Sequence, residues 1–120
     1  MSHFTTVKTQ FLEKGTLLEV LKELGYDVIY ENIQRYRNQI LNVDFQIKVS
    51  ESHYIGFKRN GKTFDMVGDL YYIPNHREII RKIKQNYAKK IVVRNIRRQG
   101  YNIIEEKNEN NTIKMVVVKR

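Results

Sequence analysis

The spacing of hydrophobic residues predicts short strands interspersed with two helices. Residues 2–10 are rich in β-branched and aromatic side chains, which favours a first strand. Over residues 13–24, leucines such as Leu17 and Leu21 recur on one face at helical spacing, which predicts an amphipathic helix. Gly25 follows at the position where a helix commonly ends in a left-handed residue.

The middle of the chain predicts strands and tight turns. We expect a strand over residues 26–30, a loop over the polar, aperiodic residues 31–39 and a half-buried strand over residues 45–49. Asn60-Gly61 is the preferred pair for a type I′ turn, which predicts a β-hairpin around it. A two-residue turn there would place Arg59 opposite Lys62, Phe57 opposite Phe64 and Ile55 opposite Met66. The core face of the hairpin would then hold Ile55, Phe57, Phe64 and Met66.

The last third of the chain predicts a long helix and a second hairpin. Pro74 and Asn75 mark a helix start, with Asn75 as the N-cap, and Gly100 marks its end, so we expect a helix over residues 76–99. Residues 101–105 and 112–118 predict a final hairpin, whose apolar second strand we expect inside the sheet.

Together these elements predict an α+β fold in one domain, residues 1–120. The element order is β-α-β-β-β-β-α-β-β. This order favours a mostly antiparallel sheet built from hairpins, with both helices packed on one face.

Hydrophobic residues change sides partway along the long helix. At about 100° per residue, the first half places on one side Ile79, Ile80, Ile83, Tyr87 and Ile91. The second half places on nearly the opposite side Ala88, Val92, Val93 and Ile96. Either the helix kinks or breaks near residues 86–90, or its halves pack on different surfaces, one of which a second subunit would supply.

Positive charge is concentrated on the same helix. The chain holds 22 Lys and Arg against 13 Asp and Glu, a net charge of +9. Residues 77–99 hold nine cations and one acid, or +8, so the rest of the chain contributes +1. The candidate contacts to RNA or another anionic partner are the cations that group together in the second half: Lys90, Arg94, Arg97 and Arg98. A packing helix with solvated cations explains the same pattern, and cations in the last turn oppose the helix dipole.

Composition excludes several classes of function. The chain has no cysteine, which removes disulfides, thiolate catalysis and cysteine-ligated metals. No apolar run approaches the roughly 20 residues that span a bilayer, so we expect a soluble protein. The 14 Ile, 13 Lys, 11 Asn and 8 Tyr, against one Ala and one Pro, indicate an AT-rich genome such as that of an organelle. Part of the lysine count therefore reflects codon usage.

Few residues form a pattern typical of catalysis or of metal binding. His3, His53 and His76 are isolated from one another, so we expect no metal site. Asp65 and Asp69 lie four apart near the end of a predicted strand, which permits a carboxylate pair for acid–base chemistry or for a divalent cation. Such residues are more often solvated strand-end acids, here facing Lys58, and we favour that interpretation. Three tyrosines that could stack nucleic-acid bases match no RNA-binding spacing and are expected to pack: Tyr54, Tyr71 and Tyr72.

Short motifs along the whole chain resemble the family called hypothetical chloroplast reading frame thirty-five. The matching motifs are Ser2-His3-Phe4, Leu24-Gly25-Tyr26, Ile55-Gly56-Phe57 running into Asn60-Gly61, Asp69, Tyr87-Ala88 and Gln99-Gly100-Tyr101. The chain departs from the family in one place, because Leu70-Tyr71-Tyr72 stands where relatives often carry tryptophan. The resemblance implies a location in the plastid and carries no known reaction, so it supplies no catalytic residue.

We therefore expect a non-catalytic plastid protein of the stroma that needs no cofactor and acts as a binding or assembly factor. In the first interpretation it is a protein–protein adaptor, with a homodimer as one possible state. In the second it binds RNA or an anionic partner through Lys90, Arg94, Arg97 and Arg98. A third, an enzyme using Asp65 and Asp69, requires binding of a divalent ion.

Overall fold

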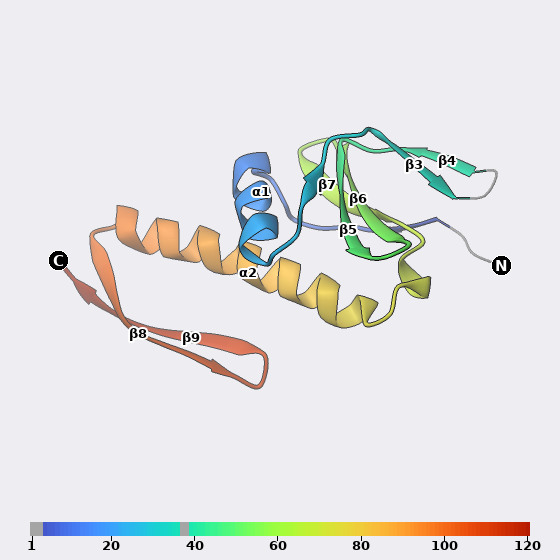
Figure 1. Ribbon diagram of the computed structural model, residues 1–120. Coiled ribbons are helices and arrows are strands. Elements are labelled where there is room, and N and C mark those ends of the chain that lie inside the picture. The colour runs from blue at the N-terminus through green and yellow to red at the C-terminus, as the bar shows by residue number, and fades with distance from the viewer. Residues whose placement is uncertain (1–3, 37–38) are drawn as a thin grey trace.

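The computed structural model describes residues 4–36 and 39–120 and is elongated (Figure 1), with extents of 56 × 29 × 21 Å. The strands are β1 Thr5–Val7, β2 Val28–Ile29, β3 Ile33–Tyr36, β4 Gln39–Asn42, β5 Phe45–Ser50, β6 His53–Asn60, β7 Thr63–Gly68, β8 Tyr101–Glu109 and β9 Thr112–Lys119. The helices are α1 Lys14–Glu23 and α2 His76–Arg98, with a 3₁₀ turn, η1, at Leu70–Tyr72. The α+β class and the predicted order are confirmed, with one hairpin more than expected.

The main sheet is antiparallel, with strand order β1-β7-β6-β5-β2. One face carries three buried rings, in which Phe45 stacks on Phe57 at 5.1 Å and lies 5.7 Å from Phe64. Both helices cover this face, as predicted, because the same buried cluster contains Leu17 of α1 and Ile83 of α2. Burial of these side chains on one sheet face is the main source of stability of this part of the fold.

The β6–β7 hairpin has the predicted core face but a different register. Phe57 lies opposite Met66 and Asn60 opposite Thr63, so the turn residues are Gly61-Lys62 and not Asn60-Gly61. A type I′ turn needs positive φ at both central residues, whereas here only Gly61 has one, at 63°, which matches a type II′ turn. The register is shifted by two residues, and an even shift leaves every side chain on its predicted face.

The stretch expected to be a loop, residues 31–39, instead contributes to a second hairpin, β3–β4, although residues 37 and 38 lie outside the described part of the chain. The base of this hairpin contacts the other face of the main sheet, where Gln34 lies near Gly68 and Val43 near Gly56. Its inward residue is polar: Gln34 is 6% exposed and donates to Gln46 Oε1 at 3.4 Å. Because a glutamine occupies the buried position, apolar periodicity could not reveal the strand.

Helix α2 is continuous, so it does not break near residues 86–90, and its halves pack on different surfaces. The first half lies on the main sheet, where Ile83 and Tyr87 are buried. The second half extends beyond the sheet and lies alongside the β8–β9 ribbon (Figure 1). The alternative of two packing surfaces is therefore correct, and the second surface comes from the same chain.

The final hairpin forms where predicted, but β9 does not lie inside a sheet. β8 and β9 pair only with each other among the described strands, so the ribbon has two edges. Val116 and Val118 of the apolar run are 46% and 43% exposed. The turn residues Asn110 and Asn111 both have positive φ, at 48° and 63°, as a type I′ turn requires.

Other element ends are shorter or differently made than expected. β1 covers only Thr5–Val7. Two residues after it, the hydroxyl of Thr9 donates to the Phe64 carbonyl at 2.6 Å, where a continuing strand would use a backbone amide. β2 is reduced to Val28–Ile29. Asn75 is the N-cap of α2, but its side chain makes no capping hydrogen bond, and its carbonyl accepts from Ile79 N.

Candidate functional site

The contact between α1 and α2 positions the candidate site. The hydroxyl of Tyr87 accepts hydrogen bonds from the backbone N–H groups of Leu12 and Glu13, at 3.1 and 3.0 Å. Its ring lies 4.8 Å from that of Phe11. These N–H groups precede α1, whose N-cap side chain makes no capping bond. One buried side chain of α2 therefore fixes how the chain enters α1.

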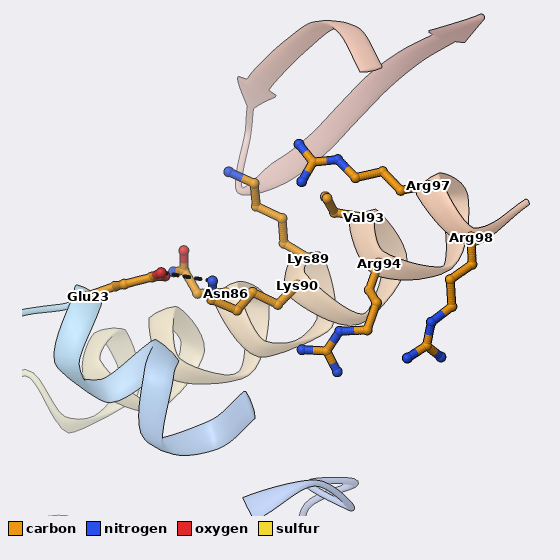
Figure 2. Close-up of a pocket in the computed structure, with 8 residues that line it drawn as sticks. All are labelled: Glu23, Asn86, Lys89, Lys90, Val93, Arg94, Arg97 and Arg98. Atoms are coloured by element: carbon orange, nitrogen blue, oxygen red, sulfur yellow. Dashed lines mark ion pairs between the residues drawn. The ribbon is translucent and has the colours of Figure 1, made fainter. Parts of the chain in front are cut away.

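The four predicted cations line one groove beside α2, together with Lys89, Asn86, Val93 and Glu23. This basic groove has a volume of about 560 Å³. Figure 2 shows Arg97 extending toward the ribbon and Arg98 away from it. The sequence hypothesis thus placed Lys90, Arg94, Arg97 and Arg98 together, and the helix brings them to a common surface.

Acids of α1 and of the ribbon neutralise three of the cations that line the basic groove. Lys90 Nζ lies 2.8 Å from Glu23 Oε1 and 3.6 Å from Glu19 Oε2, and hydrogen bonding to Glu23 raises the pKa of Lys90 above its ordinary value. Arg94 donates to Glu13 Oε1 at 2.8 Å. Lys89 pairs with Glu106 of β8. These three cations hold α1 and β8 against α2.

Arg97 and Arg98 differ from the other cations of the groove. Neither guanidinium forms an ion pair with any residue in the described ranges, and both side chains are exposed. The Arg97 carbonyl accepts from the guanidinium of Arg120, which fastens the end of the ribbon to the end of the helix. The positive charge left for an external anion is therefore that of two arginines.

Two apolar hollows adjoin each other across the second half of α2. One, of about 730 Å³, lies between α2 and the segment that precedes α1; the other, of about 450 Å³, lies between α2 and β9. Ala88 and Val92 line both hollows. We call this continuous surface the apolar groove, and its main residues are Leu12, Ala88, Ile91, Val92, Ile96 and Val117.

The apolar groove is open to solvent and has a basic rim. Leu12 is 58% exposed, Val92 46% and Val117 37%. Lys8 and Lys84 border the hollow on the α1 side, and within the described residues neither forms an ion pair. Exposed apolar surface that is continuous and bordered by charge is typical of an interaction site.

Asp65 and Asp69 do not form the acid pair that the sequence allowed. Asp65 is 4% exposed, faces Lys58 across the strands, and accepts from Asn60 Nδ2 at 3.1 Å, so it is a buried structural acid and not a solvated one. Asp69 lies beyond the end of β7 and lines a pocket that does not include Asp65. Within the described residues, no group of three His, Cys, Asp or Glu side chains is placed to hold a metal ion.

The structure brings some of the predicted histidines and tyrosines together, since His53 lines the same pocket as Tyr54 and Tyr72. His53 is hydrogen-bonded to Ser50, His76 packs edge-on against Tyr71 with ring centroids 5.6 Å apart, and His3 lies outside the described residues. Tyr54 and Tyr72 line the pocket that contains Asp69.

Sequence reasoning missed the apolar groove. Val92 was identified as part of the switched face, but Leu12 and Val117 lie far from it in the chain and carry no local signal. Their placement depends on the packing of three elements around α2.

Comparison with known proteins supports the resemblance found in the motifs. The chain is 28% identical to the uncharacterised protein ycf35 of Pyropia yezoensis and 27% identical to those of Cyanophora paradoxa and Guillardia theta. Each similarity covers 98% of this chain and 96% of the relative. No solved structure matches the chain. Within the described residues, no helix has the length and hydropathy needed to cross a membrane. The model of a family described as a protein of unknown function, DUF1257, matches residues 20–117, and the chain belongs to that family.

Proposed function

We propose that this protein is a non-catalytic adaptor of the plastid stroma, which binds an acidic amphipathic segment of a partner protein in the apolar groove. The observation that carries the proposal is the double role of Ala88 and Val92. Because both line the two hollows, the apolar surface runs without interruption across α2 from Leu12 to Val117. The relatives named ycf35 and the codon composition support the plastid location.

The shape and charge of the groove favour this kind of occupant. A groove between a helix and flanking segments accepts the apolar face of an amphipathic helix, whose anchors recur at i, i+3, i+4 and i+7. The rim lysines Lys8 and Lys84 have no acid of their own among the described residues, so they can pair with acids that flank those anchors.

A defined probe tests the proposal. We expect a designed acidic amphipathic helical peptide of about five turns, with leucines at the anchor spacing, to bind at least about tenfold tighter than a scrambled peptide of equal composition. Fluorescence anisotropy of the labelled peptide measures the difference. The scrambled control removes the apolar face and leaves the charge unchanged.

Val92→Glu is expected to weaken binding of the probe by at least about tenfold, because it places a buried charge at the centre of the interface. Val116→Glu is the matched control: Val116 has the same exposure, 46%, but lies on the face of the ribbon that points away from α2. Equal losses in both variants, or a dimer whose formation excludes the peptide, would contradict the proposal.

A second candidate function, RNA binding through the basic groove, rests on Arg97 and Arg98, which have no acid partner among the residues that the structure describes. If RNA binds there, Arg97→Ala/Arg98→Ala should reduce the slope of log affinity against log salt by about 1.4, since each phosphate contact on single strands contributes about 0.7. Lys62→Ala/Arg77→Ala removes two cations that lie outside the groove and form no ion pair within the described part of the chain, and it should leave the slope unchanged. Filter binding to a labelled oligonucleotide over a range of salt concentrations measures both, and equal slopes would exclude the groove.

A further inference from the structure

A small pocket lies at the end of β7, near the start of α2, and shares no lining residue with either groove. Its volume is about 180 Å³. Its lining includes Phe4, Gln34, His53, Tyr54, Asp69 and Tyr72. Two side-chain oxygens of these residues, Gln34 Oε1 and Asp69 Oδ1, are buried and have no hydrogen-bond partner among the described residues.

The orientation of the Gln34 amide is determined by its neighbours. Gln46 Nε2 donates to the carbonyls of Glu31 and Ile33, at 3.1 and 3.2 Å. The Oε1 atom of Gln46 therefore faces Gln34. Gln34 Nε2 donates a hydrogen bond to it at 3.4 Å. This leaves Gln34 Oε1 without a donor, on a side chain that is only 6% exposed. An amide flip would place two oxygens against each other, so the unpartnered atom is an acceptor.

Asp69 supplies the second acceptor and a formal negative charge. It is the N-cap of η1, where its backbone carbonyl accepts from Tyr72 N at 3.2 Å while its side chain makes no capping bond. Asp69 Oδ1 is therefore the second buried acceptor without a donor among the residues that line the pocket. Two buried acceptors without donors cost about 1–3 kcal/mol each unless something donates to them.

The chemistry of the pocket selects among the possible donors. An anion is repelled by two acceptors, one of them charged. Calcium takes six to eight oxygen ligands and prefers carboxylates, whereas Asp69 is the one carboxylate among the described residues that line the pocket. A single water can donate to both oxygens but fills about 30 Å³. A protonated amine donates up to three hydrogen bonds, balances the charge of Asp69, and is attracted to the faces of the aromatic rings that line the pocket.

We propose that this pocket binds a primary alkylammonium group, with Asp69 and Gln34 as its hydrogen-bond acceptors. The inference is independent of the adaptor function, because it uses neither groove. The group can belong to a small free amine or to a lysine side chain of another protein, which share the same chemistry.

Titration with n-butylammonium chloride, followed by ¹H–¹⁵N NMR of the full chain, tests the proposal. We expect saturable shifts at the amides of residues 52–54 and 69–72, with a dissociation constant of about 1–10 mM for a ligand of so few heavy atoms. Tetramethylammonium carries the charge without N–H donors and should bind at least about tenfold more weakly. A parallel titration with Nα-acetyl-lysine amide distinguishes the sources, because tighter binding than butylammonium indicates a lysine side chain.

Asp69→Asn keeps the volume of the side chain and should weaken butylammonium binding by about 10–100-fold, the range for a hydrogen bond to a charged group. Glu51→Gln is the control: Glu51 is an exposed acid close to the pocket in sequence and is not part of its lining. Gln34→Met, which removes the other acceptor, provides an independent variant if Asp69→Asn disturbs folding. Absence of saturable shifts with either amine, equal binding of tetramethylammonium, or equal effects of the Asp69 and Glu51 variants would overturn the proposal.

Discussion

Replacement of Tyr87 by phenylalanine is expected to lower the free energy of unfolding by about 1–3 kcal/mol, the cost of leaving buried polar groups without a partner. The hydroxyl of Tyr87 accepts from the backbone N–H groups of Leu12 and Glu13, and the residue is 6% exposed. Tyr87→Ala also removes the ring that packs on Phe11 and should cost about 3–5 kcal/mol. Since small proteins are stable by only about 5–15 kcal/mol, either loss is large.

Urea denaturation monitored by circular dichroism measures these changes as a shift of the midpoint at constant slope. Tyr71→Phe is the control, because Tyr71 is 70% exposed, and its hydroxyl group should contribute less than about 0.5 kcal/mol. If Tyr87→Phe is as stable as Tyr71→Phe, the hydroxyl group does not hold the entry to α1.

Gly56→Ala is expected to destabilise the fold by about 1–3 kcal/mol, the usual cost of overpacking a core. A Cβ at Gly56 would lie 2.5 Å from Cγ1 of Val43 and 3.2 Å from Cγ2 of Val67. Val43 follows β4, so the clash would push the β3–β4 hairpin away from the main sheet. That hairpin carries Gln34, so the same change should disturb the amine pocket.

A double-mutant cycle isolates this steric effect. Val43→Ala removes the closest methyl group, so Gly56→Ala should cost less in the Val43→Ala background than in the original chain. Gly15→Ala is the matched control: it lies in α1 with no atom within 4 Å of the added Cβ, and should stabilise by about 0.5–1 kcal/mol. Purely additive losses at positions 43 and 56 would show that the close approach is not the cause.

Local patterns predicted the core face of the sheet but not every pairing. The alternation of Ile55, Phe57, Phe64 and Met66 assigned these side chains to the buried side, and they are all buried. The turn type depends on backbone angles, and Asn60, whose side chain bonds Asp65, does not adopt the positive φ that its partner Gly61 has. Sequence preference for Asn-Gly therefore selected the right turn region and the wrong two residues.

In two other strands, β3 and β9, hydrophobic periodicity does not reveal how the strand is buried. The inward residue of β3 is Gln34, whose partner Gln46 lies 12 residues away, so its burial follows from a polar contact that no apolar pattern encodes. The apolar run of β9 was expected inside a sheet. Only one face of this run has neighbours, because α2 covers that side. A strand that a helix covers has the same apolar composition as a strand between two others, so the sequence cannot distinguish them.

The sequence predicted where the candidate cationic site lies, but not how many of its cations form ion pairs with acids of the same chain. Helical spacing brought Lys90, Arg94, Arg97 and Arg98 to one groove. The acid that pairs with Arg94, Glu13, precedes it by 81 residues and meets it only through the packing of α1 on α2. This pairing is why the geometry favours the adaptor over RNA binding, since only two of the four cations remain available.

The β8–β9 ribbon is fastened to α2 mainly by contacts that water can reach. Gln85 donates to the Asn111 carbonyl near its tip, Lys89 pairs with Glu106 at its middle, and Arg120 donates to the Arg97 carbonyl at its base. Such contacts cost less to separate than a buried core, so we expect the ribbon to open locally while the main sheet stays intact. Hydrogen exchange measures this opening: the amides of the ribbon should exchange faster than those of β6, and the width of the apolar groove would change with the opening.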